Sequence, residues 1–566
     1  MQKAARKDYY DVVVIGSGVG GLTAAALLSK SGLSVCVLEK EPHPGGYLAG
    51  FRRKDFLFDT AIHWLNQYGP DGMLTRLFDV LGKDHPAAVP QQRIRRYLGK
   101  GYDYLLTNNP DEMRDQLIAD FPHERAGILR FFATAKKIGN SLKNFNSIFR
   151  SGETMSFLER LLNKVGILRF IIPFIPYVMY SGEKGLRKGL RKFFRDPKLL
   201  DVFTSELELI GCFVPVGWAY FGDFQNPPKG GSQVIPQWLE HVIGFYGNPI
   251  FYQSRVTEIM VEDGTSTGVK FMFKERPVEL KCKYVIAAND IETLYEKMLP
   301  ATAIPPKLKQ RLKTAELYSS SVTISIALDC ATETLGFNEE MIHLADEGLP
   351  FADYAGGDPE KSELIILAPT VRDKSLAIPG QGTLTIFMPA TMDFEQQWQT
   401  TKDADGNYVR GEAYKKLKLN IAEAIIKRVA ERLSPELQQH ILFYEVATPV
   451  THYRYTGNKN GTMMGARPGR ANMQNNIAHY QTPVKRLILG GHWAELGGGV
   501  PLAAKAGANA ALLVLKEENK PAFRALAAYL DGKATLETTL AKDCFKVYDD
   551  SWIQPLTPGE KKGILT

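Results

Sequence analysis

The stretch VVVIGSGVGGLTAA, residues 12–25, decides the fold of this 566-residue chain. It opens with a continuous run of β-branched residues, which is typical of a strand buried on both faces of a parallel sheet. Gly16-x-Gly18-x-x-Gly21 follows at once, and then an Ala- and Leu-rich segment that Gly32 closes, as expected of a tight turn and a helix. A GxGxxG alone is weak support for a binding site, because glycines occur in many turns.

The residues after the helix make the motif specific. A second apolar run, LSVCVLE, ends in Glu39 and completes a βαβ unit with an acid about 20 positions after the glycines. In such a unit Gly16 allows the turn, Gly18 lets the backbone approach a pyrophosphate, and Gly21 lets the helix pack on the strand. The helix N-terminus favours the phosphates. Glu39 favours a free ribose 2′-hydroxyl, so the motif predicts a site for FAD or NAD and excludes NADP.

Composition indicates a folded protein of two or three domains, with 44% hydrophobic and 23% charged residues. The net charge is +7, from 69 basic and 62 acidic side chains. The five cysteines are widely spaced, which argues against a disulfide framework or a zinc site and favours a reducing compartment facing the cytosol. We therefore expect no resident metal. We also expect no secretory signal and no membrane-spanning helix, because the sequence shows neither pattern.

Three further segments distinguish FAD from NAD. EPHPGGYLAGFRRKDFLFDTAIHW (residues 41–64) carries a glycine pair where an NAD domain would start its next βα unit. Residues 227–271 and 281–290 predict a glycine turn, a helix, a hairpin and a strand ending in VIAA. RLILGGHWAELGGGVPLAAKAGANAALLVL (residues 486–515) predicts a strand, a glycine-rich turn and a small-residue helix.

With these segments the sequence resembles the flavoproteins of the carotenoid desaturase group, which includes phytoene desaturases, carotenoid isomerases and retinol saturases. FDTAIHW at residues 58–64 is most similar to the retinol saturase branch. The resemblance implies an α/β fold in which a Rossmann-like FAD-binding domain of the amine-oxidase type carries an inserted mixed-sheet and helical substrate domain. It also implies the domain ranges: residues 1–84, 228–299 and 446–520 for FAD, residues 85–227 and 300–445 for the substrate and the membrane, and a C-terminal tail at 521–566.

The resemblance assigns cofactor contacts residue by residue. These are expected at Gly16, Gly18, Val19, Gly21, Glu39, Lys40, Gly45, Gly46, Tyr47, Val256, Ala287, Gly491, His492, Gly499 and Val500. Two of these positions depart from the family pattern, which often has Arg where this chain has Tyr47 and an acid where it has His492. The departures affect the expected hydrogen bonds at the flavin end of the site.

The implied function is FAD-dependent chemistry on a carbon–carbon double bond of a long apolar polyene, of carotenoid or retinoid type. Saturation, desaturation and flavin-assisted isomerisation all remain open, and the sequence does not name the redox partner. Two alternatives use the same scaffold: an amine or porphyrinogen oxidase, and a non-catalytic lipid carrier of the GDP-dissociation-inhibitor type.

A membrane contact is predicted at residues 165–195. Ile167 to Tyr180 is almost wholly apolar but too short to span a bilayer. Lys184 to Arg195 reads as a basic amphipathic helix whose other side carries Leu186, Leu190, Phe193 and Phe194. Such a segment would lie in the membrane interface. We therefore expect a cytoplasmic protein with peripheral membrane association. A core helix with a solvated basic face is the alternative.

Catalytic candidates are few, because a flavin needs little from the protein beyond position, dryness and a proton donor or acceptor. His63 follows the flavin-side hairpin and is the first candidate, with a merely structural histidine as the alternative. Glu495 is the second, with a role at a helix start as its alternative. Nucleic-acid binding is not expected, since the single basic segment is interleaved with aliphatic residues.

Overall fold

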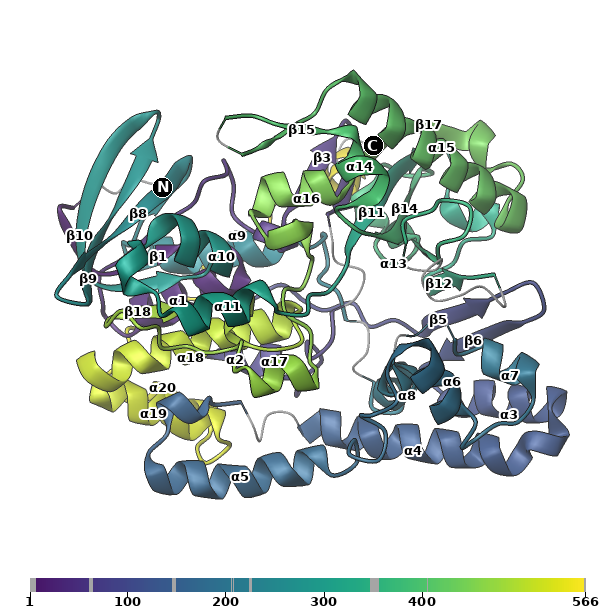
Figure 1. Ribbon diagram of the computed structural model, residues 1–566, viewed down its shortest axis with the longest axis horizontal. Coiled ribbons are helices and arrows are strands. Elements are labelled where there is room, and N and C mark those ends of the chain that lie inside the picture. Colours follow the sequence, from purple (N-terminus) through teal and green to yellow (C-terminus); the bar gives the residue numbers. More distant parts are fainter. Residues whose placement is uncertain are drawn as a thin grey trace.

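Two seven-stranded sheets organise the chain, and helices cover both (Figure 1). The structure is a computed structural model that describes residues 7–60, 65–144, 149–204, 206, 208–222, 226–346, 356–404 and 406–563. The first sheet lies on the left of the view and the second on the upper right, with a helical layer below the second. His63, the first catalytic candidate, falls outside the described residues.

The first sheet contains the predicted βαβ unit. Its strand order is β7-β2-β1-β10-β9-β8, with β18 also paired to β10. Its strands are β1 (Tyr9–Ile15), β2 (Val35–Leu38), β7 (Ile250–Phe251), β8 (Ser254–Glu262), β9 (Thr265–Phe273), β10 (Arg276–Ala287) and β18 (Leu487–Leu489). β1 pairs in parallel with β2 and β10, so Ile15 lies between Leu38 and Ala287. The β-branched run of β1 is buried because sheet neighbours and helices surround it.

Three helices pack around β1 and its neighbours: α1 (Val19–Lys30), α9 (Val234–Phe245) and α18 (Val500–Glu518). Every residue of α1 is buried, which only a sequence this rich in Ala, Gly and Leu permits at close helix contact. α18 contributes a similar small-residue face, from Ala504 to Leu515. These observations confirm the predicted α/β fold with a Rossmann-like dinucleotide-binding unit.

The second sheet is mixed and has its own core. Its order is β17-β11-β14-β13-β12-β5-β6, and β12 pairs with β5 in parallel while the other pairs are antiparallel. Its strands are β5 (Arg93–Leu98), β6 (Asp103–Thr107), β11 (Ser320–Leu328), β12 (Met341–Leu344), β13 (Leu364–Leu367), β14 (Gly382–Ala390) and β17 (Ile441–Ala447). The long helix α15 (Glu412–Leu433) packs its apolar side into this core.

A helical layer adjoins β5 and β6. It consists of α3 (Pro110–Asp120), α4 (Arg125–Lys143), α6 (Gly182–Leu190), α7 (Pro197–Asp201) and α8 (Leu209–Ala219). The apolar side chains of the predicted amphipathic helix are buried here, with Leu186 3%, Leu190 0%, Phe193 8% and Phe194 0% exposed. They pack around Phe131. The prediction that these four side chains face a membrane is therefore wrong, because a cluster of aromatic rings inside the protein takes them up.

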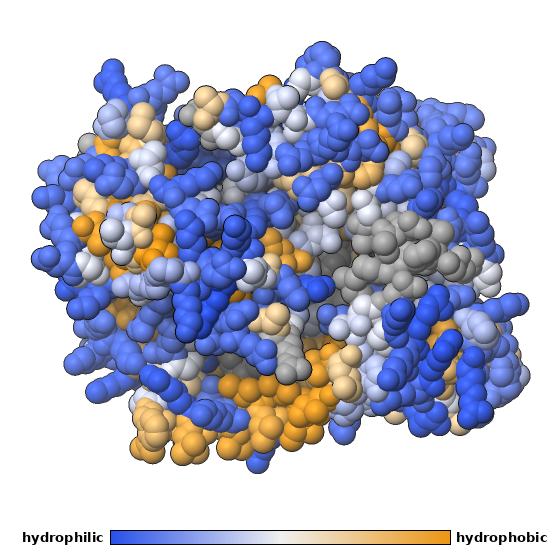
Figure 2. All heavy atoms as spheres, viewed as in Figure 1, coloured by the Kyte–Doolittle hydropathy of each residue, from blue (hydrophilic) through white to orange (hydrophobic). Residues whose placement is uncertain are grey.

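The preceding segment is exposed instead. α5 (Phe157–Ile171) begins at a capping box formed by Ser156 and Glu159, and none of its residues is buried. We call its exposed apolar side chains and those of the next turns the α5 patch: Phe157, Leu158, Leu161, Leu162, Val165, Leu168, Ile171, Ile172, Ile175, Val178 and Met179. Figure 2 shows apolar side chains gathered along the lower edge of the molecule, where Figure 1 places α5. Among the described residues, no helix combines the length and hydropathy needed to cross a membrane.

The C-terminal residues are part of the first core. α19 (Lys520–Leu530) packs on α18 and buries Leu526, and farther along Tyr548 donates a hydrogen bond to Asp84. The expected tail at 521–566 is thus packed structure over much of its length.

The remaining elements are β3 (Gly50–Arg53), β4 (Phe56–Asp59), α2 (Met73–Leu81), α10 (Ile291–Thr293), α11 (Pro306–Lys313), α13 (Pro369–Arg372), α14 (Phe394–Gln399), β15 (Thr401–Lys402), β16 (Tyr408–Val409), α16 (Pro449–Thr456), α17 (Arg470–Gln474), α20 (Leu536–Leu540) and α21 (Pro558–Gly563).

Candidate functional site

The glycine turn lies between β1 and α1, at the carboxyl end of the central strand. Gly16 has φ +96°, a conformation that side chains rarely adopt, so the turn itself requires glycine there. A Cβ on Gly21 would overlap the Gly16 carbonyl oxygen, so the helix packs this closely only without a side chain. A Cβ on Gly18 would meet open space instead. Gly18 thus presents bare backbone to the space beside it, as a pyrophosphate would need.

Glu39 follows β2 directly and lies beside this turn. Its Oε2 accepts hydrogen bonds from the backbone N–H and the hydroxyl of Ser17, each at 2.7 Å. Its Oε1 accepts one from the backbone N–H of Glu41 at 2.9 Å. The side chain is 7% exposed and lines a cavity. The parallel pairing of β1 with β2 brings these residues together, as the βαβ prediction requires.

The cavity has a volume of about 1470 Å³ and extends from the glycine turn to the second sheet. Pockets for a single small ligand run to roughly 300–1,000 Å³, so this space holds more than one such molecule. Its first-sheet side is lined by Gly16, Gly18, Val19, Glu39, Lys40, Gly45, Gly46, Tyr47, Val256, Ala288, Gly491, His492, Gly499 and Val500. Its second-sheet side is lined by Thr323, Ser325, Phe387, Val446, Ala447 and Val450, with Met463 and Met464 nearby.

Most of the candidate site residues therefore share one cavity, and Gly21, Ala287 and Glu495 do not line it. Ala287 lies in β10, one residue before Ala288, which does line the space. Glu495 is engaged elsewhere: its carboxylate accepts hydrogen bonds from the Tyr480 hydroxyl and from Lys505 Nζ, the latter at 3.0 Å. That ion pair places Glu495 in a structural contact, so its position argues against proton exchange with a molecule in the cavity.

Two helices begin at the cavity. α1 starts after Gly18 and α18 starts after Gly499, and both N-termini carry unpaired N–H groups and a partial positive charge. Gly499 has φ +83°, and Val500 is the first residue of α18. The sequence predicted the first helix start from the GxGxxG motif. Only the fold brings the second one, hundreds of residues later in the chain, to the same space.

Tyr47 and His492 stand where the family pattern has other residues, and both are polar groups in the cavity wall. The Tyr47 hydroxyl donates a hydrogen bond to the Thr462 carbonyl at 2.7 Å, and burial raises its pKa to about 12. Burial lowers the pKa of His492 to about 4, so the imidazole is neutral near pH 7. Its Nε2 is buried and has no hydrogen-bond partner among the described residues. This atom lies against Gly465, which does not line the cavity, so other atoms of His492 form the cavity wall.

A second histidine was missed by sequence reasoning. His452 lies in α16 and lines the cavity, and its Nε2 is 3.1 Å from Ser321 Oγ. Burial lowers its pKa to about 4. Tyr453 and Arg454, its neighbours, also line the cavity, and the Arg454 carbonyl accepts a hydrogen bond from Lys40 Nζ at 3.0 Å. The sequence feature that could have pointed to His452 is the run THYRY at residues 451–455, in which a histidine and two tyrosines precede a glycine.

Lys40 is one of the cationic groups in the wall. Burial lowers its pKa, although Glu41 and Glu39 act in the opposite direction. The lysine spans from the βαβ unit to α16 through its bond to Arg454. It therefore ties together two segments that lie far apart in the sequence.

Comparison with known proteins agrees with this geometry. Residues 14–81 match the NAD(P)-binding Rossmann-like domain. Prolycopene isomerase of Daucus carota is 27% identical over 472 residues, covering 81% of this chain and 72% of that protein. All-trans-retinol 13,14-reductase of Danio rerio is 25% identical over 529 residues, covering 86% of this chain and 83% of that protein. These similarities fit the carotenoid isomerase and retinol saturase family that the sequence segments indicated.

Among solved structures, cyclohexylamine oxidase from Brevibacterium oxydans matches with a TM-score of 0.53 at 14% identity, over 90% of this chain and 99% of that one. At that identity the likeness concerns the fold, and it confirms the predicted amine-oxidase-like architecture. Taken with the curated relatives, the comparisons support a flavin-dependent oxidoreductase.

Proposed function

We propose that this chain binds FAD and acts on a carbon–carbon double bond of a long apolar polyene of carotenoid or retinoid type. The observation that carries the proposal is a single cavity that joins the glycine turn and Glu39 to the second sheet. Its volume accommodates an extended dinucleotide together with part of a second molecule.

The adenosine end of FAD would lie against the βαβ unit. Glu39 would accept hydrogen bonds from the ribose, Gly16, Gly18, Val19 and Gly21 would form the turn under the pyrophosphate, and Val256 would lie near the adenine. The flavin end would be held by Gly45, Gly46 and Tyr47 on one side and by Gly491, His492, Gly499 and Val500 on the other. His492 and Gly491 line the same cavity as Gly45, Gly46 and Tyr47, which supports this placement.

The bound flavin would supply two-electron chemistry, and the protein would supply position, dryness and proton control. Desaturation would remove a hydride and a proton from neighbouring carbons of the polyene. Saturation would return both, and isomerisation would leave the electron count unchanged. His452 and His492 are neutral near pH 7, so each ring carries one N–H donor and one acceptor nitrogen without placing positive charge in the pocket. His63 stays a proposal for the same role.

The second-sheet side of the cavity fits an apolar guest. Phe387, Val446, Val450, Met463 and Met464 line it, and methionine side chains adapt to long flexible molecules. The amine-oxidase alternative rests on fold likeness alone at 14% identity. The curated relatives cover most of the chain, and their printed names concern a carotenoid and a retinoid. That difference favours the polyene.

We also propose peripheral membrane association, now placed at the α5 patch instead of the basic segment that follows it. Leu158, Leu162 and Met179 are 70%, 73% and 74% exposed, and apolar side chains gathered in this way mark an interaction surface. Exposed cations lie on the same helix as the patch: Arg160, Lys164 and Arg169. Apolar residues beside cations suit the acyl boundary of an anionic membrane.

The direct test uses purified protein. Acid-released cofactor identified as FAD by chromatography would support the cofactor, whereas colourless protein with no flavin would support the carrier alternative. Anaerobic mixing then separates the reactions. Bleaching of oxidised flavin by a polyene indicates desaturation, reoxidation of pre-reduced flavin indicates saturation, and a new isomer without a net flavin change indicates isomerisation. Bleaching by amines with none by polyenes would overturn the polyene proposal in favour of the amine oxidase.

A further inference from the structure

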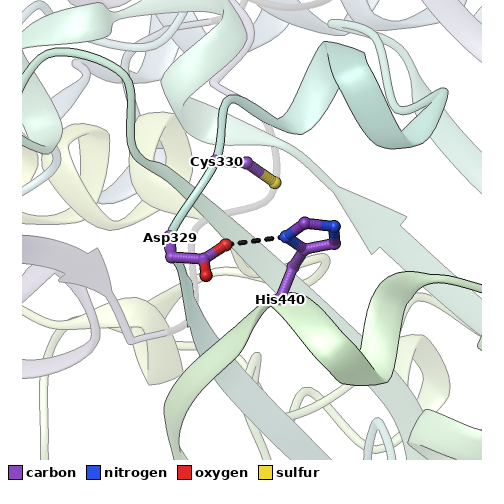
Figure 3. A group of neighbouring side chains, drawn as sticks. All are labelled: Asp329, Cys330 and His440. Carbon is purple, nitrogen blue, oxygen red and sulfur yellow. Dashed lines mark hydrogen bonds and ion pairs between the residues drawn. The ribbon is translucent and has the colours of Figure 1, made fainter.

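Three metal-ligating side chains meet outside the cavity, at the open end of the second sheet. The candidate ligand atoms of Asp329, Cys330 and His440 all lie within 4.8 Å of one another. Asp329 Oδ1 and His440 Nδ1 are 2.8 Å apart, and Figure 3 shows the three side chains converging on a shared space. None of the three lines the cavity described above, so the cluster is separate from the proposed flavin site.

The backbone fixes the positions of these residues. β11 ends at Leu328, which pairs with Ile441, the first residue of β17. Just beyond that pair, the backbone N–H of Asp329 donates to the His440 carbonyl at 3.1 Å. His440 ends a short 3-10 helix, Leu437–His440, that begins with the fully buried Leu437. The ligands therefore project from a hydrogen-bonded strand pair and its buried flank.

The set of donors selects the metal. A thiolate and an imidazole favour zinc and related transition metals, whereas Ca²⁺ and Mg²⁺ prefer oxygen ligands throughout. With Zn–S near 2.3 Å and Zn–N or Zn–O near 2.0 Å, tetrahedral ligand atoms stand about 3.3–3.6 Å apart. The three atoms here lie within 4.8 Å of one another, and small side-chain rotations would bring them to that spacing. The carboxylate of Asp329 is 47% exposed and the imidazole of His440 34%, which leaves a fourth position for water.

We propose that Asp329, Cys330 and His440 form a zinc site with three protein ligands and one water. The metal would replace the Asp329–His440 hydrogen bond and join the end of β11 to the start of β17. Its role would be structural, because the cluster lies apart from the cavity lining. The proposal departs from the expectation of no resident metal, which relied on ligand spacing along the sequence. Asp329 and His440 are 111 positions apart, and strand pairing alone brings them together.

The test measures Zn²⁺ binding to the full-length protein after chelator treatment, by competition with a chromophoric chelator. We expect one site per chain in the wild type. Cys330→Ser should weaken it by more than about 100-fold, since loss of an outer-shell partner alone costs roughly 10–100-fold. Cys544→Ser is the matched control, because Cys544 is the other cysteine of intermediate exposure, and it should leave binding unchanged.

Co²⁺ gives a second readout. The Co²⁺-loaded wild type should show a thiolate-to-cobalt charge-transfer band that Cys330→Ser abolishes and Cys544→Ser keeps. If Cys330→Ser does not fold, Asp329→Asn, on an exposed side chain, serves in its place and should weaken Zn²⁺ binding. Equal Zn²⁺ affinity in wild type and both ligand variants, or no binding in the wild type, would leave an ordinary Asp–His ion pair and overturn the proposal.

Discussion

The carboxylate of Glu39 is held by Ser17, whose N–H and hydroxyl both donate to Oε2 at 2.7 Å. Ser17 stands between the first two glycines of the turn, so the acid at the end of β2 is fixed against the loop that would carry the pyrophosphate. The relationship orients a buried negative charge before any ligand arrives. Preorganised charge of this kind binds a hydroxyl at little cost in reorganisation.

Glu39→Ala should therefore lower FAD affinity. A hydrogen bond to a charged group contributes about 1.5–3 kcal/mol, which corresponds to roughly 10- to 150-fold in the dissociation constant. Fluorescence titration of the apoprotein with FAD measures the change. Glu258→Ala removes an exposed carboxylate of β8 that pairs with Lys270, and it should bind FAD as the wild type does. Equal affinity in the two variants would contradict the ribose assignment.

Gly18→Ala and Gly21→Ala should fail in different ways. A Cβ on Gly21 would overlap the Gly16 carbonyl oxygen, so this variant should destabilise the apoprotein by about 1–3 kcal/mol through overpacking. A Cβ on Gly18 would meet open space, so this variant should keep the apoprotein melting temperature but bind FAD more weakly. Differential scanning fluorimetry with and without FAD separates the two effects. A Gly18→Ala protein with normal FAD affinity would place the pyrophosphate elsewhere.

His452 should make the protein sensitive to acid. Its pKa falls from about 6.5 in the unfolded chain to about 4 in the folded protein, so below pH 6.5 the unfolded state takes up the proton first. This group therefore leaves the free energy of unfolding unchanged above pH 6.5 and lowers it as the pH falls towards 4. The expected decrease in the free energy of unfolding is about 2 kcal/mol between pH 7 and 5.

The measurement is apparent melting temperature against pH. His452→Gln should show a shallower decline between pH 7 and 5 than the wild type does. His123→Gln, at a side chain that is 61% exposed, should keep the wild-type slope. If all three proteins show the same slope, His452 does not account for the loss of stability at low pH.

The α5 patch should govern membrane binding. Replacing Leu158, Leu162 and Val165 by Ser removes apolar side chains from the centre of the patch and should reduce partition into anionic vesicles by more than about tenfold. Cosedimentation with the vesicles measures the partition. Val547→Ser with Ile553→Ser is the matched control, because both side chains are 86% exposed but lie outside the patch. Undiminished binding by the triple variant would exclude α5 as the contact.

The local pattern of the sequence predicted the dinucleotide-binding half well. The β-branched run, the GxGxxG turn and Glu39 lie within 28 residues, and their geometry depends on one strand pair and one helix. The late segment at 486–515 was placed by resemblance, and the structure brings Gly491, Gly499 and Val500 to the same cavity. Glycine requirements of this kind are local and can be read from sequence.

The sequence was a poorer guide to which amphipathic segments are buried than it was to the dinucleotide-binding half. The basic segment 184–195 has a strong apolar side, but its leucines and phenylalanines pack inside the helical layer. α5 lacks so clear a polar face, yet it lies exposed. Periodicity shows that a segment has an apolar side, and it does not show whether protein or lipid covers that side.

By itself the sequence determined the βαβ unit and the family to which the chain is similar, and it predicted a preference for an unphosphorylated ribose. The tertiary structure alone decided that Glu495 pairs with Lys505 away from the cavity, that His452 joins its wall, and that Asp329 and Cys330 meet His440. The reason is physical: a turn motif depends on backbone conformation over a few residues. Contacts between distant side chains depend instead on how strands pair and helices pack, which no single stretch of sequence encodes.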